Sequence, residues 1–496
     1  MKKLNLFLAL LFLLGAGIRV IEVNRPVDRP SWRECDVAGI ARSYNREGMN
    51  LFYPRVDWRG DSPGYAEMEL PVYPWLIAWG YKLFGYHESI GRIINYVFSL
   101  LTLIVFFKLA KYLLPPWGTI AAATFFTFNP LLINVSNSLQ PEGLMFLGYV
   151  LAGYLFIRWL DNESKWYLLG ACAATATAIL AKATAAHIGL FFALLILSKY
   201  GWAAIRQARL WLFAIGALLP GALWYWHAHK FWTQYGNSLG VSNEYHWAGL
   251  DLFTNPAFVF GIARSELLYV WMLAGVFLAG AAMVWKWREK PVQYGVGWFV
   301  ATIVYYLIAA RTTGDQWAAY YHIVAVPGAA LLIGSGVEAL RQLQPAAPWT
   351  RALRIAGVAS LLGIVALQAR QITVDAKHWQ ASALRDCAES FATLIPKEDL
   401  ILVTGGVCRD EGYPVAYNAS FMLYWADRKG FNVCIEEQSL ESVAGFIKRG
   451  AKYYLAAKST FRTKKQLEED LRRTYPVRAE CDDYCLFQLK PHDVRD

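Results

Sequence analysis

The stretch WRECDVAGIARSYNREGMNLFYPRVDWRGDSPGYAEMELPVYPWL, residues 32–76, follows the first hydrophobic segment of the chain. It is too polar to cross a bilayer, because it gathers ionisable side chains beside aromatic and proline-rich sequence. Most of the chain that follows is apolar, in runs of membrane-spanning length. We therefore look for chemistry in this stretch and in the few polar residues near the same membrane face.

Composition indicates a membrane protein. Of the 496 residues, 56% are hydrophobic and 17% are charged, whereas soluble domains carry about 25% charged residues. The formal net charge is +10, but the basic residues are spread over many loops. A positive-inside bias explains this excess better than nucleic-acid binding, so no nucleic-acid partner is expected.

Apolar runs predict about eleven crossings of the bilayer. The runs are residues 4–21, 90–113, 117–134, 141–158, 166–182, 186–200, 210–226, 267–285, 293–310, 319–340 and 354–370. Lys and Arg concentrate in one set of connecting loops, which we assign to the cytoplasm together with the N-terminus. The first run is expected to stay as an uncleaved signal anchor, with cleavage as the alternative. The expected location is the bacterial inner membrane.

The opposite, periplasmic side then receives a large first loop, residues 22–89, and the tail. In the tail the runs DLILVTG and AKYYLAA predict strands, with amphipathic helices between them. We predict a membrane domain over residues 1–370 and a small periplasmic α/β domain over residues 371–496. Five of the seven cysteines lie in this tail, which is typical of an oxidising compartment, and their pairing cannot be read from the sequence.

An amphipathic helix is predicted from Asp36 to Glu47, lying at the membrane interface. It would hold Asp36 near the lipid headgroups, where a carboxylate can take a proton from a hydroxyl. A solvated helix cap or loop acid is the alternative. Arg42 and Arg46 lie four residues apart on one helix face, and they would either grip a phosphate or bind anionic headgroups.

Three runs in this region carry a resemblance: CDVAGIARSY (35–44), GMNLFYPRV (48–56) and EMELPVYPWLIAWGYKLFG (67–85). They resemble the first outer loop of the C-type membrane glycosyltransferases (GT-C fold) related to protein O-mannosyltransferases and the lipid A aminoarabinose transferase. The resemblance extends over about residues 1–345 through the order and spacing of motifs. By position, Asp36 matches the catalytic acid of that group.

Two departures from the group's pattern concern the site. The group commonly has Asp-Glu where this chain has Asp36-Val37, so a second acid must come from elsewhere or be unnecessary. Some members have Lys-Pro-Pro, whose lysine contacts phosphate, where this chain has Glu69-Leu70-Pro71. That phosphate contact therefore cannot be carried over.

The resemblance implies an inverting transferase that moves one sugar from a polyprenyl-phosphate (undecaprenyl-phosphate) donor to a lipid, polysaccharide or protein acceptor. Asp36 would be the general base. The phosphate would be held by Lys182, Arg42, Arg46 or Arg311. Predicted substrate-binding residues are Glu67, Glu69, Tyr73, Glu142, Tyr320, Tyr321 and His322. Snorkelling of Lys182, a helix-dipole role for Glu142 and simple packing of His322 are the alternatives.

The aromatic loop over residues 224–247 predicts either stacking on sugar rings or an interfacial belt. His227, His229 and His246 have no diagnostic metal-binding spacing, so no cofactor or metal is required, with a divalent metal left open. A transporter or flippase for a lipid-linked glycan is the alternative function, and a non-catalytic scaffold is a third. The transporter reading expects ionisable residues near the bilayer midplane, and the apolar segments hold almost none.

Overall fold

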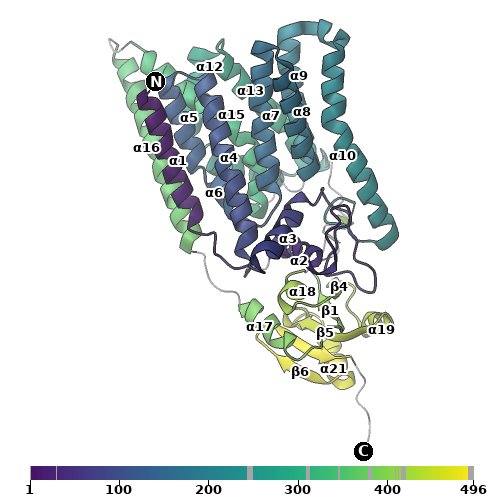
Figure 1. Ribbon diagram of the computed structural model, residues 1–496. Helices are drawn as coiled ribbons and strands as arrows, with labels where there is room; N and C mark the ends of the chain where they lie inside the picture. Colours follow the sequence, from purple (N-terminus) through teal and green to yellow (C-terminus); the bar gives the residue numbers. More distant parts are fainter. Residues whose placement is uncertain are drawn as a thin grey trace, which may run out of the picture. The chain divides into compact units, whose positions relative to one another are not determined.

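The computed structural model describes residues 2–28, 31–242, 250–308, 313–314, 316–344, 347–377, 383–407, 409–410, 413–414 and 420–489. The chain forms two compact units (Figure 1). The first unit comprises Met1–Asn24, Arg92–Leu223 and His246–Trp379, and the second comprises Arg25–Gly91, Trp224–Tyr245 and Gln380–Asp496. The predicted boundary at residue 370 stays a prediction, because the tail belongs to the same unit as the first loop.

The first unit is built from long apolar helices. They are α1 (Lys2–Val20), α4 (Ser89–Leu113), α5 (Pro116–Phe128), α6 (Pro130–Asn137), α7 (Glu142–Asn162), α8 (Lys165–Ala181), α9 (Ile188–Tyr200), α10 (Ala208–Tyr235), α11 (Pro256–Ser265), α12 (Ala274–Lys286), α13 (Lys290–Ile308), α15 (Val326–Gln342) and α16 (Pro348–Lys377). The part of α10 from Trp224 onward belongs to the second unit. Short helical turns join them, namely η1 (Ala183–His187), η2 (Gly201–Arg206), η3 (Leu250–Thr254), η4 (Glu266–Val270) and η5 (Gln316–Ala325).

The chain is a polytopic helical membrane protein, and every predicted apolar run falls on one or more of these helices. Within the described residues, seven helices are long and apolar enough to span a bilayer, or nine if two bent pairs each count as one span. The predicted number of about eleven crossings stays a prediction. One bent pair is α5 and α6, where Pro130 lacks the N–H that would continue the helix and Asn129 caps the amide of Leu131 at 3.1 Å.

Helix α15 lies at the centre of the first unit: the span Ala319–Gln342, formed by η5 and α15, has 94% of its membrane window buried inside the protein. Its small residues let neighbouring backbones approach. A Cβ atom at Gly334 would lie 2.5 Å from the carbonyl oxygen of Gly118 on α5, and one at Gly336 would lie 1.9 Å from that of Leu278 on α12. Close packing of this kind replaces the hydrophobic effect as the force that joins helices in lipid.

The second unit combines α2 (Trp32–Glu47) and α3 (Val72–Phe84) of the first loop with an α/β tail. The tail carries a five-stranded sheet in the order β4-β1-β5-β7-β6, in which β4, β1 and β5 are parallel and β7 is antiparallel to both of its neighbours. The strands are β1 (Leu400–Thr404), β4 (Gly430–Val433), β5 (Ala451–Ala457), β6 (Val477–Glu480) and β7 (Tyr484–Gln488). Two-residue strands β2 (Arg409–Asp410) and β3 (Tyr413–Pro414) pair separately.

The tail helices are α17 (Ala383–Ala392), α18 (Ser420–Ala426), α19 (Leu440–Lys448), α20 (Lys458–Phe461) and α21 (Lys465–Thr474). The predicted strands DLILVTG and AKYYLAA are β1 and β5, whose side chains are almost all buried in the sheet core. A disulfide joins Cys387 of α17 to Cys481 beside β7. It closes 94 residues of chain, a pairing that the sequence alone left open.

Candidate functional site

Helix α2 carries the predicted catalytic acid and is confirmed as a helix. It starts earlier than expected, at Trp32, because the hydroxyl of Ser31 caps the amide of Glu34 at 3.3 Å. Every residue from Cys35 to Tyr44 is buried, including the polar ones, so protein covers both faces of the helix. The amphipathic pattern predicted one apolar face only. The polar face is covered as well because α3 and α18 pack against α2 within the same unit (Figure 1).

Asp36 is 3% exposed, and its carboxylate is only partly satisfied. Its Oδ1 accepts a hydrogen bond of 2.8 Å from the indole N–H of Trp58, while Oδ2 accepts none from the residues that the structure describes. Burial raises the pKa of Asp36 to about 7, against the opposing effects of the Trp58 bond, the charge of Arg33 and the hydroxyl of Ser420. A carboxyl with a pKa near neutrality and a free acceptor atom suits a general base.

Arg42 lies one turn and a half further along α2 and is held on several sides. Its guanidinium donates to Asp57 Oδ2 at 2.8 Å and to the carbonyl oxygen of Tyr424 at 2.9 Å, pairs with Asp427 at 3.0 Å, and lies 4.7 Å over the Tyr424 ring. Burial opposes ionisation of Asp57, but Lys429 and Arg42 outweigh it and hold the pKa of that carboxyl well below its usual range. Arg42 is therefore engaged by the carboxylates of its own unit.

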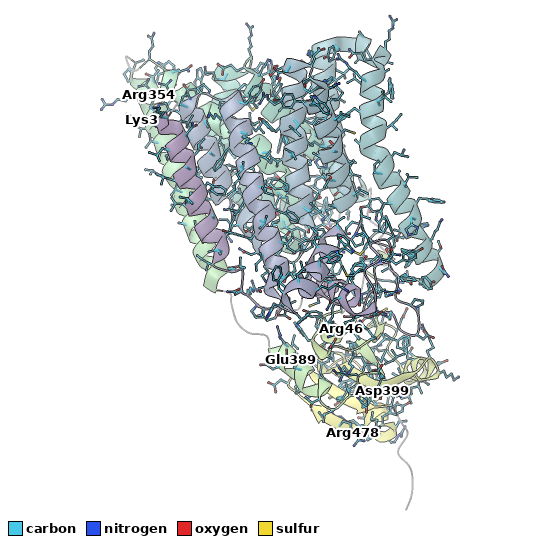
Figure 2. All side chains as sticks on the ribbon, in the orientation of Figure 1. Lys3, Arg46, Arg354, Glu389, Asp399 and Arg478 are labelled. Carbon is cyan, nitrogen blue, oxygen red and sulfur yellow. A yellow bond between two sulfur atoms is a disulfide. The ribbon has the colours of Figure 1, made fainter. Side chains whose placement is uncertain are left out.

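Arg46, labelled in Figure 2, is half exposed and also pairs with Asp427, at 2.7 Å. Both predicted phosphate ligands of α2 thus meet one acidic residue of the tail. The tail residue Ser420 of α18 donates to the carbonyl oxygen of Trp32 at 2.8 Å, at the start of α2. Residues of the tail therefore contact both ends of the helix that carries Asp36. No local sequence pattern indicated these contacts.

The predicted substrate-binding residues of the first loop are all buried and bonded within the second unit. Glu69 pairs with Arg33, and the hydroxyl of Tyr73 donates to the carbonyl oxygen of Gly91 at 2.9 Å. Glu67 accepts from Ser238 at 2.7 Å and from Ser242 at 2.9 Å, and its Oε1 lies 2.9 Å from His229 Nδ1.

Sequence reasoning missed the two serines that join this cluster. They lie in the aromatic loop that it did single out, about 170 residues from Glu67. The first part of that predicted loop is helical, because α10 continues to Tyr235. His227 lies on this part of α10, with its ring edge-on to that of Tyr53. Among the described residues no group of three or more His, Cys, Asp or Glu is arranged to hold a metal, and His246 lies outside those residues.

In the first unit the structure brings four predicted site residues together. Lys182 terminates α8, and its ammonium group contacts Glu142 Oε1 at 2.5 Å at the start of α7. The same ammonium lies 3.7 Å from the ring centre of Tyr321 and 5.4 Å from that of Tyr320. Glu142 is 2% exposed, and its Oε2 has no partner among the described residues. A half-buried, charge-paired lysine that lies over two aromatic rings is unlike a lysine that snorkels to the headgroups.

His322 is fully buried in a separate network of the first unit. Its Nδ1 lies 2.8 Å from Glu266 Oε1 and its Nε2 lies 2.8 Å from the carbonyl oxygen of Thr313. Glu266 also accepts from Tyr306 and from the indole of Trp271, the latter at 2.9 Å. Glu266 was not predicted, although an acid directly before the apolar run 267–285 was a usable signal. Arg311 lies outside the described residues.

Comparison with known proteins supplies the family context. Residues 62–226 match the family model described as dolichyl-phosphate-mannose-protein mannosyltransferase. No curated protein sequence matches the chain. Among solved structures, ArnT from Cupriavidus metallidurans in the apo state is 16% identical, with a TM-score of 0.62 over 97% of this chain and 97% of that chain.

The archaeal oligosaccharyltransferase AglB from Archaeoglobus fulgidus, in complex with an inhibitory peptide and a dolichol-phosphate, is also similar. It is 11% identical, with a TM-score of 0.54 over 94% of this chain and 72% of that chain. At such identities the likeness shows the fold. The predicted resemblance is confirmed: residues 62–226 match the mannosyltransferase model, and the chain as a whole has the fold of the C-type membrane glycosyltransferases that ArnT and AglB share.

Proposed function

We propose that this protein is an inverting glycosyltransferase that uses a polyprenyl-phosphate sugar, such as an undecaprenyl-phosphate sugar, as donor. One sugar passes to a lipid, polysaccharide or protein acceptor. The observation that carries the proposal is the buried carboxyl of Asp36, with one oxygen unpartnered among the described residues and a pKa of about 7. The fold and the family match over residues 62–226 support the reaction class.

The proposed reaction is a single displacement at the anomeric carbon. The acceptor hydroxyl attacks C1 of the sugar while Asp36 takes its proton. The bond between C1 and the phosphate oxygen breaks with its electron pair, so the polyprenyl phosphate leaves as an anion and the configuration at C1 inverts. A fixed cation stabilises the charge that develops on the leaving oxygen.

Lys182 is the proposed cation, because of the side chains that contact it within the first unit. Glu142 and the rings of Tyr320 and Tyr321 hold its ammonium group in a defined place, and a pre-positioned charge costs little reorganisation when the leaving group becomes negative. Arg311 stays a second proposed phosphate ligand on sequence grounds. Arg42 and Arg46 are proposed instead to position α2, because Asp57 and Asp427 already engage them.

We also propose that the tail lies on the periplasmic side of a bacterial inner membrane and that the N-terminus lies in the cytoplasm. The disulfide between Cys387 and Cys481 supports this orientation, because such bonds persist mainly in oxidising compartments. The basic loops of the first unit support it independently through the positive-inside rule.

The test replaces Asp36 with Asn and measures sugar release from synthetic polyprenyl-phosphate sugars in membranes. We expect a loss of about a hundredfold or more, as for removal of a general base. Asp61→Asn is the matched control, since Asp61 is an exposed acid of the same loop that pairs only with Arg449 among the contacts seen. Full turnover by folded Asp36→Asn protein would refute the assignment. Movement of the intact donor across the bilayer without sugar release would favour the transporter alternative.

A further inference from the structure

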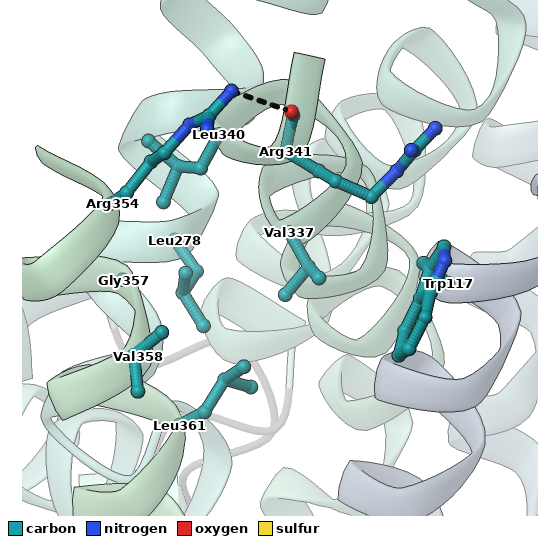
Figure 3. A pocket seen from close by; sticks show the side chains of 9 residues that line it. All are labelled: Trp117, Leu278, Val337, Leu340, Arg341, Arg354, Gly357, Val358 and Leu361. Carbon is teal, nitrogen blue, oxygen red and sulfur yellow. Dashed lines mark hydrogen bonds between the residues drawn. The ribbon is translucent and has the colours of Figure 1, made fainter. Parts of the chain in front are cut away.

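An apolar groove lies in the first unit, and none of the candidate site residues lines it (Figure 3). Its cavity measures about 310 Å³, within the range of small-molecule sites, and its wall is formed by α5, α12, α15 and α16. Leu278, Val337, Val358 and Leu361 are among its apolar lining residues. Gly357 allows α16 to approach α15, because a Cβ atom there would lie 2.4 Å from Leu340.

Two guanidinium groups, those of Arg341 and Arg354, line one end of the groove (Figure 3). Arg341 is 52% exposed and donates to Glu338 Oε1 through two nitrogens, Nε at 3.1 Å and Nη2 at 2.6 Å. Arg354 donates to the carbonyl oxygens of Arg341 and Leu343, where α15 ends. Its guanidinium is therefore fixed in place beside the groove.

Positive charge exceeds negative charge at this end of the helices. Lys286 is joined to the C-terminus of α15 through Gln342 at 2.6 Å, and Arg351 precedes Arg354 by one helical turn. Glu338 and Glu289 are the acids that pair with these cations in the described structure. The excess favours an anionic occupant.

The groove opens toward lipid. Only 17% of the membrane window of α16 is buried inside the protein, compared with 94% for the span formed by η5 and α15. Val358 on α16 and Trp117 on α5, both lining the groove, are 58% and 57% exposed. Apolar side chains exposed on a membrane-spanning helix face acyl chains rather than water.

We propose that this groove binds an anionic phospholipid. One acyl chain lies against Leu278, Val337 and Leu361, and the phosphate lies between the guanidinium groups of Arg341 and Arg354. Basic pockets between membrane helices are a recurrent way of holding such headgroups. A choline lipid fits less well, because its positive headgroup would face the same cations.

The test measures thermal unfolding of the full-length protein in detergent with added dioleoylphosphatidylglycerol or dioleoylphosphatidylcholine, and counts retained lipid by native mass spectrometry. We expect phosphatidylglycerol to stabilise the protein more than phosphatidylcholine does. Arg341→Gln should weaken phosphatidylglycerol binding about fivefold, the equivalent of one juxtamembrane cation. Val358→Trp should fill the groove and abolish the difference between the two lipids.

Arg206→Gln is the matched control, because Arg206 is an exposed arginine at a helix end that does not line this groove. It should leave the preference for phosphatidylglycerol unchanged. Arg341 is used rather than Arg354, whose bonds to α15 also support the fold. Inorganic phosphate alone should give no shift, since it lacks the acyl chain. Equal stabilisation by both lipids, or an unchanged preference in both groove variants, would overturn the proposal.

Discussion

Trp58→Phe tests whether the buried carboxyl of Asp36 is the group that takes the proton. The indole N–H of Trp58 donates to Asp36 Oδ1 at 2.8 Å and favours the ionised form. A hydrogen bond to a charged group is worth about 1.5–3 kcal/mol, and one pKa unit corresponds to about 1.4 kcal/mol. Removing the donor while keeping an aromatic ring should therefore raise the pKa of Asp36 from about 7 to about 8.

The pH profile of kcat/KM follows from this shift. The ionised carboxylate is the active form, so activity falls as pH drops through the pKa of the free enzyme. The acid limb should lie near pH 7 in the natural chain and near pH 8 in Trp58→Phe, with a loss of about fivefold at pH 7 that is recovered at pH 9. Trp75→Phe is the control, because the indole of Trp75 donates to the carbonyl oxygen of Met49 instead.

The pH dependence of folding stability supplies an independent check, because stability falls with rising pH whereas activity rises. The folded pKa of Asp36 lies above its usual value, so the folded state loses stability as pH rises from about 4 to about 7, where the buried group ionises. Asp36→Asn removes that cost, and the inactive variant should unfold at an equal or higher temperature than the natural chain at pH 8. An acid limb that stays in place in folded Trp58→Phe, or a destabilised Asp36→Asn at pH 8, would refute the reasoning.

Three further perturbations address other parts of the molecule. Lys182→Gln should lower kcat about a hundredfold through loss of leaving-group stabilisation, with partial recovery in Lys182→Arg; turnover of a donor with a better leaving group should be less affected. Arg42→Ala should cost about 3–5 kcal/mol of unfolding free energy, because it leaves Asp57 buried without one of its partners, and thermal unfolding in detergent measures it. Gly336→Ala should lower the unfolding temperature by forcing α12 and α15 apart, whereas Gly280→Ala, which has open space around its Cβ position, should not. Unchanged turnover in Lys182→Gln, or equal unfolding temperatures for the two glycine variants, would contradict these expectations.

Local sequence patterns predicted the helices and strands well where the hydrophobic pattern of a single segment was sufficient to identify the element. The apolar runs became the helices of the first unit, and DLILVTG and AKYYLAA became β1 and β5. The count of crossings was harder to read, since an apolar run does not reveal that α5 and α6 meet at a bend of 45° or that η4 and α12 meet at 87°. Bends depend on capping and on neighbouring helices as well as on hydrophobicity.

In the candidate site too, the sequence predicted individual residues but not the contacts between them. Asp36 was singled out from its position and its family resemblance, and Lys182 and Glu142 were singled out separately. Their surroundings were not predictable: 40 residues separate Lys182 from the Glu142 that it pairs with. The pairing of Arg42 with Asp427 joins residues from opposite ends of the chain.

The sequence by itself determined that this chain is a helical membrane protein, which stretch carries the candidate acid, and which family it resembles, because hydrophobic length and short motifs are properties of neighbouring residues. Only the tertiary structure decided that both faces of α2 are covered and that Asp36 is left with one partner, Trp58, for its two oxygens among the described hydrogen bonds. A pKa near 7 is the consequence of that burial. Burial is a property of contacts between distant segments, so no local pattern encodes it.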